Sequence, residues 1–465
     1  MTPKNLTSSQ TGRFVRLIIL SGLTVLLAAG IYCLIIQSVH AHMKAELEVD
    51  TARFDFSPDR VGLSSDVATA ARVETPDVWP NLFGPAHDNS SSESILTDWS
   101  SSGPPILWEM RVGQGYSSPI VWQDHLIIMH RVGDEEIIAC VDSTNGSPRW
   151  EHRTPTAFEC KSHYTNGPYS TPATDGDLLF TVSAEGLLQC LILESGSIVW
   201  AKDLKQEYHL PERTFGVGHS PLIWRDKVIL NVGGTGNQQG IVAFSKFSGD
   251  VLWSATRHGA SYATPQPARI HNQDFLFVLT NDAILSLDPA DGTVHWEIPF
   301  QAPIVDAENA VTPLIYGDIA LFCSYGNGTK CLRILEDGSY ELLWDSKRAL
   351  TSQFSPLVCV DEHVYGVHTG DFTFRCIELT SGKVLWRQRT NLQRATDLRV
   401  GDRLILFGEF GHLAAMEVNP TECRIICETD ESLFDNTQCF SAPAVANGRL
   451  YLRNEQTLRC LDLSP

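Results

Sequence analysis

A tryptophan recurs through this chain at intervals of 42 to 53 residues. In its clearest copies a small residue, an apolar residue and often an acid lead to a glycine four positions before the tryptophan. Five copies read CVDSTNGSPRW (140–150), CLILESGSIVW (190–200), AFSKFSGDVLW (243–253), SLDPADGTVHW (286–296) and CIELTSGKVLW (376–386). The recurring tryptophans are Trp108, Trp150, Trp200, Trp253, Trp296, Trp344 and Trp386. A fixed period of this size indicates a repeat architecture, in which each repeat packs against its neighbours.

Each repeat also opens alike, with a Ser-Pro, Thr-Pro or Ala-Pro pair followed by a short apolar run. Examples are SSPIVW (117–122) and VTPLIY (311–316). A turn and a second apolar run follow, rich in Val, Ile, Leu and Phe and bounded by Gly, Asp and Asn, which is typical of strands and hairpins. We count four strands per repeat, with the tryptophan on or just after the fourth. Four-stranded units at this period predict propeller blades.

The two ends of the repeat region complete each other. The last unit, 441–465, stops after its third strand, whereas the first tryptophan phrase, 104–110, is a fourth strand with no unit before it. An N-terminal strand that completes the C-terminal blade would close the ring and leave no free sheet edge. With six full tryptophan blades and a weaker unit at 395–428, the sequence predicts an all-β, eight-bladed β-propeller of four-stranded blades.

An uncharged run precedes the propeller. Leu17–Gln37 is about as long as a helix that crosses a bilayer. Basic residues precede this run and acidic residues follow it, so we expect one transmembrane helix with a cytoplasmic N-terminus and a periplasmic or otherwise extracytoplasmic propeller. A cleaved signal peptide ending near Ala41 is the alternative. The expected organisation is 1–16 cytoplasmic, 17–37 transmembrane helix, 38–78 flexible tether and 79–465 propeller.

Charge and cysteine content exclude some functions. A net charge of −20 argues against a nucleic-acid partner. Cys140, Cys190, Cys376 and Cys460 occupy one equivalent position in different repeats and therefore cannot pair with each other. Cys323 and Cys331 flank a GNG turn, where a disulfide or two free thiols are the alternatives. No cysteine–histidine spacing predicts a zinc site, and we expect no bound metal.

The phrases SLDPADGTVHW and CVDSTNGSPRW resemble the A-L-D-x-x-T-G-x-x-x-W pattern of the pyrroloquinoline-quinone (PQQ)-type repeat. WPNLFGPAHDNSSSES (79–94) is similar to the segment that precedes the propeller in many bacterial secreted members. The resemblance covers roughly 104–465. This family of eight-bladed propellers includes quinoprotein alcohol dehydrogenases and the BamB lipoprotein of the outer-membrane assembly machinery. The resemblance therefore implies either an enzyme or a binding scaffold, and fold alone does not choose between them.

The enzymatic branch of the family implies a quinone above the channel, calcium held by Glu, Asn and Asp, and a disulfide between adjacent cysteines. This chain has no Cys-Cys pair, and Asp306, Glu308 and Asn309 form its only compact cluster of the required kind. We therefore expect no catalytic residue and no cofactor. PQQ with calcium belongs only to the alternative, a PQQ-dependent oxidoreductase. A sensor of a small ligand at the channel mouth is a further alternative.

First strands line the central channel of a propeller, so the residues just before each Ser-Pro or Thr-Pro pair should converge at one channel mouth. Histidine, acidic, amide and aromatic groups on a rigid ring suit a binding surface, although a polar rim without function is the simpler explanation. We expect protein partners at the cell envelope to bind this mouth, in addition to the inner membrane contacted by the N-terminal helix. The side chains expected to bind the partner are His163, Tyr164, His219, His258, Glu308, Asn309 and Arg394.

Overall fold

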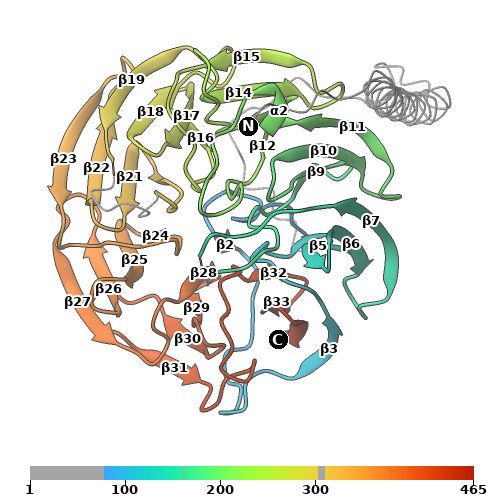
Figure 1. Ribbon diagram of the computed structural model, residues 1–465. Coiled ribbons are helices and arrows are strands. Elements are labelled where there is room, and N and C mark those ends of the chain that lie inside the picture. The colour runs from blue at the N-terminus through green and yellow to red at the C-terminus, as the bar shows by residue number, and fades with distance from the viewer. Residues whose placement is uncertain (1–77, 163, 302–308) are drawn as a thin grey trace, which may run out of the picture. The chain divides into compact units, whose positions relative to one another are not determined.

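The computed structural model describes residues 78–162, 164–301 and 309–465. These residues form eight mainly antiparallel sheets that follow one another around a central channel (Figure 1). The all-β, eight-bladed propeller with four-stranded blades is thus confirmed. The expected transmembrane helix at 17–37 and the expected tether at 38–78, apart from Val78, lie outside the described residues; Val78 begins a strand. Within the described part of the chain, none of the helices has the length and apolar character to span a membrane.

Blades 1 to 4 follow the chain without interruption. Blade 1 contains β4 (Ile120–Trp122), β5 (His125–Val132), β6 (Glu135–Asp142) and β7 (Pro148–Pro155). Blade 2 contains β8 (Ala173–Thr174), β9 (Leu178–Val182), β10 (Leu187–Ile192) and β11 (Ile198–Asp203), followed by the short helix α2 (Leu204–Glu207). Blade 3 contains β12 (Leu222–Trp224), β13 (Lys227–Leu230), β14 (Ile241–Ser245) and β15 (Val251–Ala255). Blade 4 contains β16 (Gln266–Ile270), β17 (Gln273–Leu279), β18 (Ala283–Leu287) and β19 (Val294–Pro299).

Blades 5 to 8 complete the ring. Blade 5 contains β20 (Leu314–Tyr316), β21 (Ile319–Ser324), β22 (Gly328–Ile334) and β23 (Tyr340–Ser346). Blade 6 contains β24 (Val358–Val360), β25 (His363–His368), β26 (Thr373–Glu378) and β27 (Val384–Arg389). Blade 7 contains β28 (Thr396–Val400), β29 (Arg403–Phe407), β30 (Leu413–Glu417) and β31 (Ile425–Glu428). Blade 8 contains β32 (Ala444–Ala446), β33 (Arg449–Arg453), β34 (Thr457–Asp462) and the N-terminal strand β3 (Ile106–Arg111).

The hydrophobic core lies between the faces of adjacent blades. The middle strands of a blade are buried on both faces, as in β5, where every residue but the last is buried. The outermost strands alternate between exposed and half-buried residues, as in β7. This difference follows from face-to-face sheet packing, because only the two middle strands have a neighbouring blade over their whole length. It also explains why the middle strands read as continuous apolar runs.

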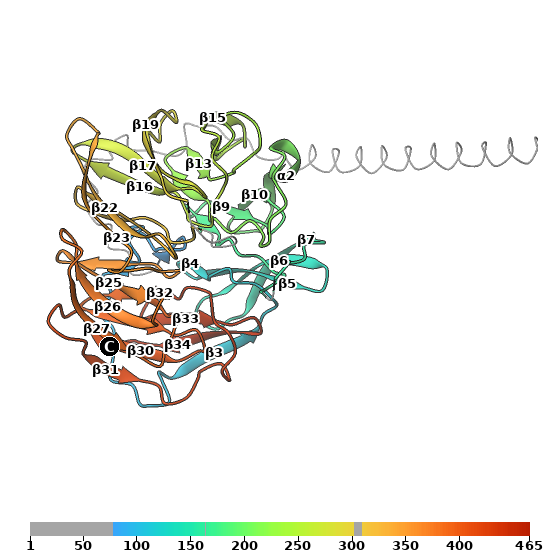
Figure 2. The ribbon, with the colours of Figure 1, turned by 60° about the vertical axis from the view of Figure 1, so that its left-hand side comes forward.

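The ring closes as expected, by an N-terminal strand that joins the C-terminal blade. β3 pairs antiparallel with β34, and Trp108 lies opposite Cys460. Both views show β3 beside the C-terminal strands (Figures 1 and 2). The last blade therefore has no unpaired outer edge on β34.

The repeated tryptophan and glycine are two halves of one contact between neighbouring blades. The indole N–H of Trp150 in blade 1 donates to the carbonyl of Leu193 in blade 2, at 2.9 Å. Gly196 of the same turn, with φ of 69°, lies so close to the ring that a Cβ atom there would be 2.4 Å from it. All seven repeat tryptophans donate in this way to the next blade. The repeat phrase therefore encodes the packing of one blade on the next.

Blade 7 lacks the tryptophan, and the N-terminal segment replaces its contact. Cys427 occupies the equivalent position, opposite Ala415. Its thiol donates to the carbonyl of Thr97, at 2.8 Å. The backbone N–H of Leu96 donates to the carbonyl of Leu463, at 2.9 Å, where an indole N–H would bond in the other blades. The junction between blades 7 and 8 is thus held by the segment that leads into β3.

We predict that Gly196→Ala destabilises the propeller more than Gly133→Ala. Both glycines have positive φ, 69° and 60°, but a Cβ at Gly133 has no neighbour within 4 Å. Backbone strain of about 1–2 kcal/mol is common to both variants, whereas overlap with the Trp150 ring should add about 1–3 kcal/mol. Thermal and urea unfolding of the two variants measures the difference. Equal losses would show that the ring contact contributes nothing.

Ring closure predicts a graded loss of stability on N-terminal truncation. A chain starting at residue 78 keeps every described contact, one starting at 104 loses the whole segment before β3 with its Leu96–Leu463 hydrogen bond, and one starting at 113 also loses β3. Trp108 is half-buried against the core, so its loss should cost less than the roughly 3–5 kcal/mol of a fully buried tryptophan, and the exposed edge of β34 should promote aggregation. Melting temperatures and light scattering of the three chains test this order. Equal melting temperatures of the three chains would show that the N-terminal strand does not close the ring.

Candidate ligand-binding site in the channel

The Ser-Pro and Thr-Pro pairs that open the repeats form a hydrogen-bonded collar around the channel. Proline has no N–H to donate and is tolerated at a strand start, while the preceding Ser or Thr bonds to the next blade. The backbone N–H of Thr171 donates to the Ser220 hydroxyl at 2.9 Å. The same bond joins Ala442 to Ser118, Ser118 to Thr171, Ser220 to Thr264 and Thr264 to Thr312. The collar thus runs from blade 8 through blades 1 to 5.

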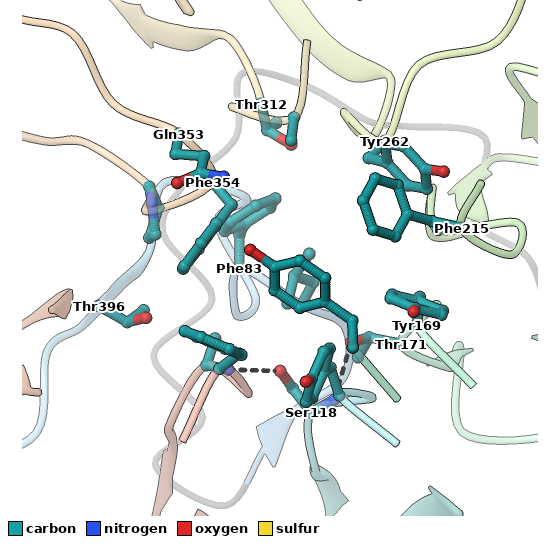
Figure 3. A pocket seen from close by; sticks show the side chains of 18 of the residues that line it. Phe83, Ser118, Tyr169, Thr171, Phe215, Tyr262, Thr312, Gln353, Phe354 and Thr396 are labelled. Atoms are coloured by element: carbon teal, nitrogen blue, oxygen red, sulfur yellow. Dashed lines mark hydrogen bonds between the residues drawn. The ribbon is translucent and has the colours of Figure 1, made fainter. Parts of the chain in front are cut away.

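A cavity of about 220 Å³ lies within the channel, and aromatic rings form most of its wall (Figure 3). The rings come from the N-terminal segment, from the loops that lead into the first strands and, for Tyr325, from the β21–β22 turn: Phe83, Tyr116, Tyr164, Tyr169, Phe215, Tyr262, Tyr325, Phe354 and Phe440. Hydroxyl and amide groups are interspersed among them: Ser118, Thr171, Thr312, Gln353 and Thr396. None of the described residues that line this cavity carries a charge.

The rings at the mouth pack edge to face. Tyr116 and Phe440 have centroids 5.2 Å apart at 88°, and Tyr164 and Phe215 are 5.3 Å apart at 79°. Phe354 meets Phe440 at 5.3 Å and 76°. Such pairs are attractive beyond their buried area, so the rings hold each other in place. The result is a preformed aromatic wall.

The N-terminal segment closes the opposite end of the channel. β1 (Val78–Trp79) pairs with the end of β4 in blade 1, and β2 (Ser90–Ser91) pairs in parallel with the end of β28 in blade 7. The residues between β1 and β2 therefore cross the channel, and Leu82 and Phe83 reach the cavity. A hydrogen bond from Thr174 to the Pro80 carbonyl, at 2.9 Å, fixes the segment to blade 2. Access to the cavity is thus from the side of the mouth loops.

One ion pair stands behind the aromatic wall. Arg394 donates to both carboxylate oxygens of the almost fully buried Glu409 and, at 3.1 Å, to the amide oxygen of Gln353. Its guanidinium also lies 5.8 Å from the Phe354 ring centroid and 5.2 Å from that of Phe440. Burial lowers the pKa of Arg394, but the bonds and charge of Glu409 outweigh this and raise it. The arginine is therefore a fixed, already paired cation.

Tyr164 and Arg394, two of the seven side chains expected at the mouth, contribute to this wall. Tyr164 lines the cavity directly, and Arg394 supports two of its rings from behind. His163 and Glu308 lie outside the described residues. The remaining three, all described, do not line the cavity.

Two of these residues have polar partners within the fold, and the third is buried without one. His219 is 1% exposed, and neither of its ring nitrogens has a hydrogen-bond partner among the described residues. Asn309 is fully buried and donates to the carbonyls of Thr280 and Phe300, at 2.8 and 2.9 Å. His258 binds Asp282 at 2.8 Å and Glu297 at 3.2 Å, toward the outer strand of blade 4.

Sequence reasoning missed several of the rings that form the cavity. Tyr169, Phe354 and Phe440 each stand one or two residues before an opening pair, in YSTP, FSP and FSAP. An aromatic residue one or two positions before an opening pair therefore indicates a place in the cavity wall. No such pattern marks Phe83, because only the fold shows that its segment crosses the channel.

The cysteines of the described region are free thiols. The disulfide alternative for Cys323 and Cys331 is wrong in this structure, since the strand register pairs Cys323 with Thr329 and Cys331 with Leu321. Their thiols point to different partners, the carbonyls of Leu350 and Leu379. Cys140, Cys190, Cys376 and Cys460 are fully buried. Across the described ranges, no group of three or more His, Cys, Asp or Glu could hold a metal ion.

Sequence comparisons relate the chain to one bacterial family. Residues 133–388 match the family model described as outer membrane protein assembly factor BamB. The BamB protein of Yersinia pestis is 21% identical over 230 residues, which are 47% of this chain and 56% of that protein. The BamB protein of Moranella endobia (strain PCIT) is 24% identical over 268 residues, 57% of this chain and 63% of that protein. The match thus spans about three fifths of each relative.

Structural comparisons show the fold. BamB from Moraxella catarrhalis superposes with a TM-score of 0.55 at 17% identity, covering 77% of this chain and 97% of that chain. Quinohemoprotein alcohol dehydrogenase from Comamonas testosteroni superposes with a TM-score of 0.61 at 13% identity, covering 84% of this chain and 81% of that chain. At these identities the likeness extends to the propeller alone.

Burial of His219 predicts a specific loss of stability in acid. Desolvation, with a smaller contribution from the Arg213 charge, lowers the pKa of His219 to about 3. Below pH 6.5 the unfolded state therefore binds a proton that the folded state excludes, so the free energy of unfolding falls as pH falls. Between pH 7.5 and 5 the loss should be about 2 kcal/mol. Urea unfolding at both pH values should show a smaller loss for His219→Gln. The same loss in both proteins would refute this origin.

Proposed function

Because the chain belongs to the family of the outer membrane protein assembly factor BamB, we propose that it is a non-enzymatic scaffold that binds other proteins of the cell envelope. The relatives' name refers to assembly at the outer membrane, and the proposed role is of the same kind. The observation that carries the proposal is the aromatic mouth of the channel. At this mouth, aromatic side chains from loops that are far apart in sequence are held together on a closed propeller.

The construction of the mouth supports protein binding. The collar and the edge-to-face ring pairs fix the mouth before any partner arrives, so little conformational entropy is lost on association. Tyrosine and arginine are the residue types most often found at the energetic centre of protein interfaces. Tyr116, Tyr164 and the Arg394–Glu409 pair place these groups around the cavity.

The location proposed for the propeller is extracytoplasmic. The run at 17–37 and its basic N-terminal flank support an inner-membrane anchor with the propeller on the outer side. The residues at 38–77 would then give the propeller reach from the membrane. Both segments lie outside the described residues.

The second candidate, a quinone-dependent dehydrogenase, is favoured by the fold likeness to quinohemoprotein alcohol dehydrogenase. PQQ is a tricarboxylate held with calcium, so its site needs both cationic and acidic side chains. The described lining of the cavity has neither, and Arg394 directs its donors to Glu409 and Gln353. These residues do not fit the cofactor, and we propose that the chain works without it.

Affinity capture from solubilised membranes tests the scaffold role. Tyr164→Ala should weaken retention of the captured partner by about 1–2 kcal/mol, as expected for an aromatic residue central to an interface. Arg394→Ala is a poor probe, because it would leave the buried Glu409 unpaired and destabilise the fold.

Asp177→Ala is the matched control, because Asp177 is exposed in the β8–β9 turn, on the opposite face of the propeller. Quantitative mass spectrometry of the captured material measures both variants. If the Asp177 variant loses the partner and the Tyr164 variant keeps it, the mouth is not the binding face.

A further inference from the structure

We propose that the channel cavity is a binding site for an uncharged aromatic group that carries a hydrogen-bonding oxygen, such as a phenol. This proposal rests on the proposed function only in that the loops proposed to bind a partner also form the cavity wall. The size, lining and charge of the cavity determine which ligand it can bind.

Size limits the ligand to about one substituted ring. The cavity measures about 220 Å³, and an apolar cavity of roughly 150 Å³ is enough to bind benzene. The floor at Phe83 closes the far end, so a ligand enters from the mouth and stops there. The ring therefore lies among the aromatic side chains, where edge and face contacts are available on several sides.

The collar supplies the polar part of the site. The hydroxyls of Ser118, Thr171 and Thr312 accept backbone N–H groups, at 2.8, 3.0 and 3.0 Å, and all three residues line the cavity. A hydroxyl that accepts a hydrogen bond still has its own O–H to donate. The wall therefore offers donors to an acceptor oxygen on the ligand. A phenolic or carbonyl oxygen meets that need, whereas a plain hydrocarbon does not.

An anion does not suit the site. Two guanidinium groups lie behind the wall, and both have partners: Arg394 donates to Glu409 and Gln353, and Arg213 donates to the carbonyl of Ala260. Burial raises the pKa of Tyr116 and Tyr169 above the usual range of a phenol, so both remain neutral hydroxyls. An anionic ligand would lose its hydration and meet only guanidinium groups that already have partners.

A cation does not suit the site either, although aromatic cages often bind quaternary ammonium groups. Of the described carboxylates near the wall, Glu409 is paired with Arg394, and Glu455 accepts the backbone N–H of Gly115 and interacts with the charge of the buried Arg453. Guanidinium groups already lie over three of the rings: Arg394 over Phe354 and Phe440, and Arg213 over Tyr262 at 5.1 Å. These three rings therefore already have a cation over them. An uncharged ligand is the remaining class.

The test uses the purified full-length chain in detergent and 4-methylphenol as the probe, measured by saturation-transfer NMR and calorimetry. We expect one site per chain. We also expect at least tenfold weaker binding of two charged analogues, 4-methylbenzoate and (4-methylphenyl)trimethylammonium, and of toluene, which lacks the oxygen. Tighter binding of either ion, or of PQQ with calcium, than of the phenol would overturn the proposal. So would absence of phenol binding.

Two variants locate the probe. Phe440→Ala removes a ring that contacts Tyr116, Phe354 and Arg394, and should weaken 4-methylphenol at least threefold. Phe247→Ala, at a ring that is 53% exposed away from the channel, is the matched control and should bind normally. If the two variants bind 4-methylphenol with equal affinity, the phenol binds outside this cavity. If Phe440→Ala does not fold, the relative affinities of the unaltered chain for 4-methylphenol and its analogues still test the proposal.

A competition experiment between 4-methylphenol and the captured partner shows whether the aromatic group belongs to the partner or to a free small molecule. It also tests the cavity proposal and the scaffold proposal separately. If 4-methylphenol displaces the captured partner, the group is a tyrosine-like side chain of that partner. If it binds without displacing the partner, the ligand is a free small molecule. If the chain binds 4-methylphenol but captures no specific partner, the cavity proposal holds and the scaffold proposal is refuted. If it captures a partner but does not bind 4-methylphenol, the cavity proposal is refuted and the scaffold proposal holds.

Discussion

The contact between one blade's tryptophan and the next blade's turn is the interaction on which the rest of this structure depends. It combines an indole hydrogen bond with close packing on a glycine, as Trp150 does with Leu193 and Gly196. Each blade is thereby oriented by its neighbour. An error at one junction would change the position of every later blade, so the junction without a tryptophan needs its own solution. Leu96 and Cys427 provide it through the N-terminal segment.

That segment ties closure of the ring to formation of the site. On its way to blade 8 it pairs with blade 1, crosses the channel, pairs with blade 7 and seals the junction with blade 8. Its crossing supplies the floor of the cavity at Phe83, while the mouth loops supply the wall. The collar then holds these loops at a fixed radius. A binding surface made of separate loops thus acquires the rigidity of the blades.

Much of the fold could be predicted from the sequence, because a repeat tryptophan marks every blade except blade 7 and the incomplete units at the two ends complete each other. The site was harder to predict. Asn309 and His219 stand next to opening pairs, as the cavity residues do, but the local backbone turns them into the protein interior. Aromatic residues before the pairs were the better signal, since a ring can pack at the mouth, whereas the Asn309 amide finds hydrogen-bond partners in the interior. No local pattern showed that Leu96 replaces an indole.

Hydrogen exchange of the collar amides tests most directly whether the mouth is a rigid part of the propeller. The backbone N–H groups of Ser118, Thr171 and Thr264 each bond across a blade boundary. If the account is right, these amides exchange as slowly as those of the middle strands, through global unfolding alone. Exchange as fast as that of exposed surface turns would contradict it, because the mouth would then open independently of the blades.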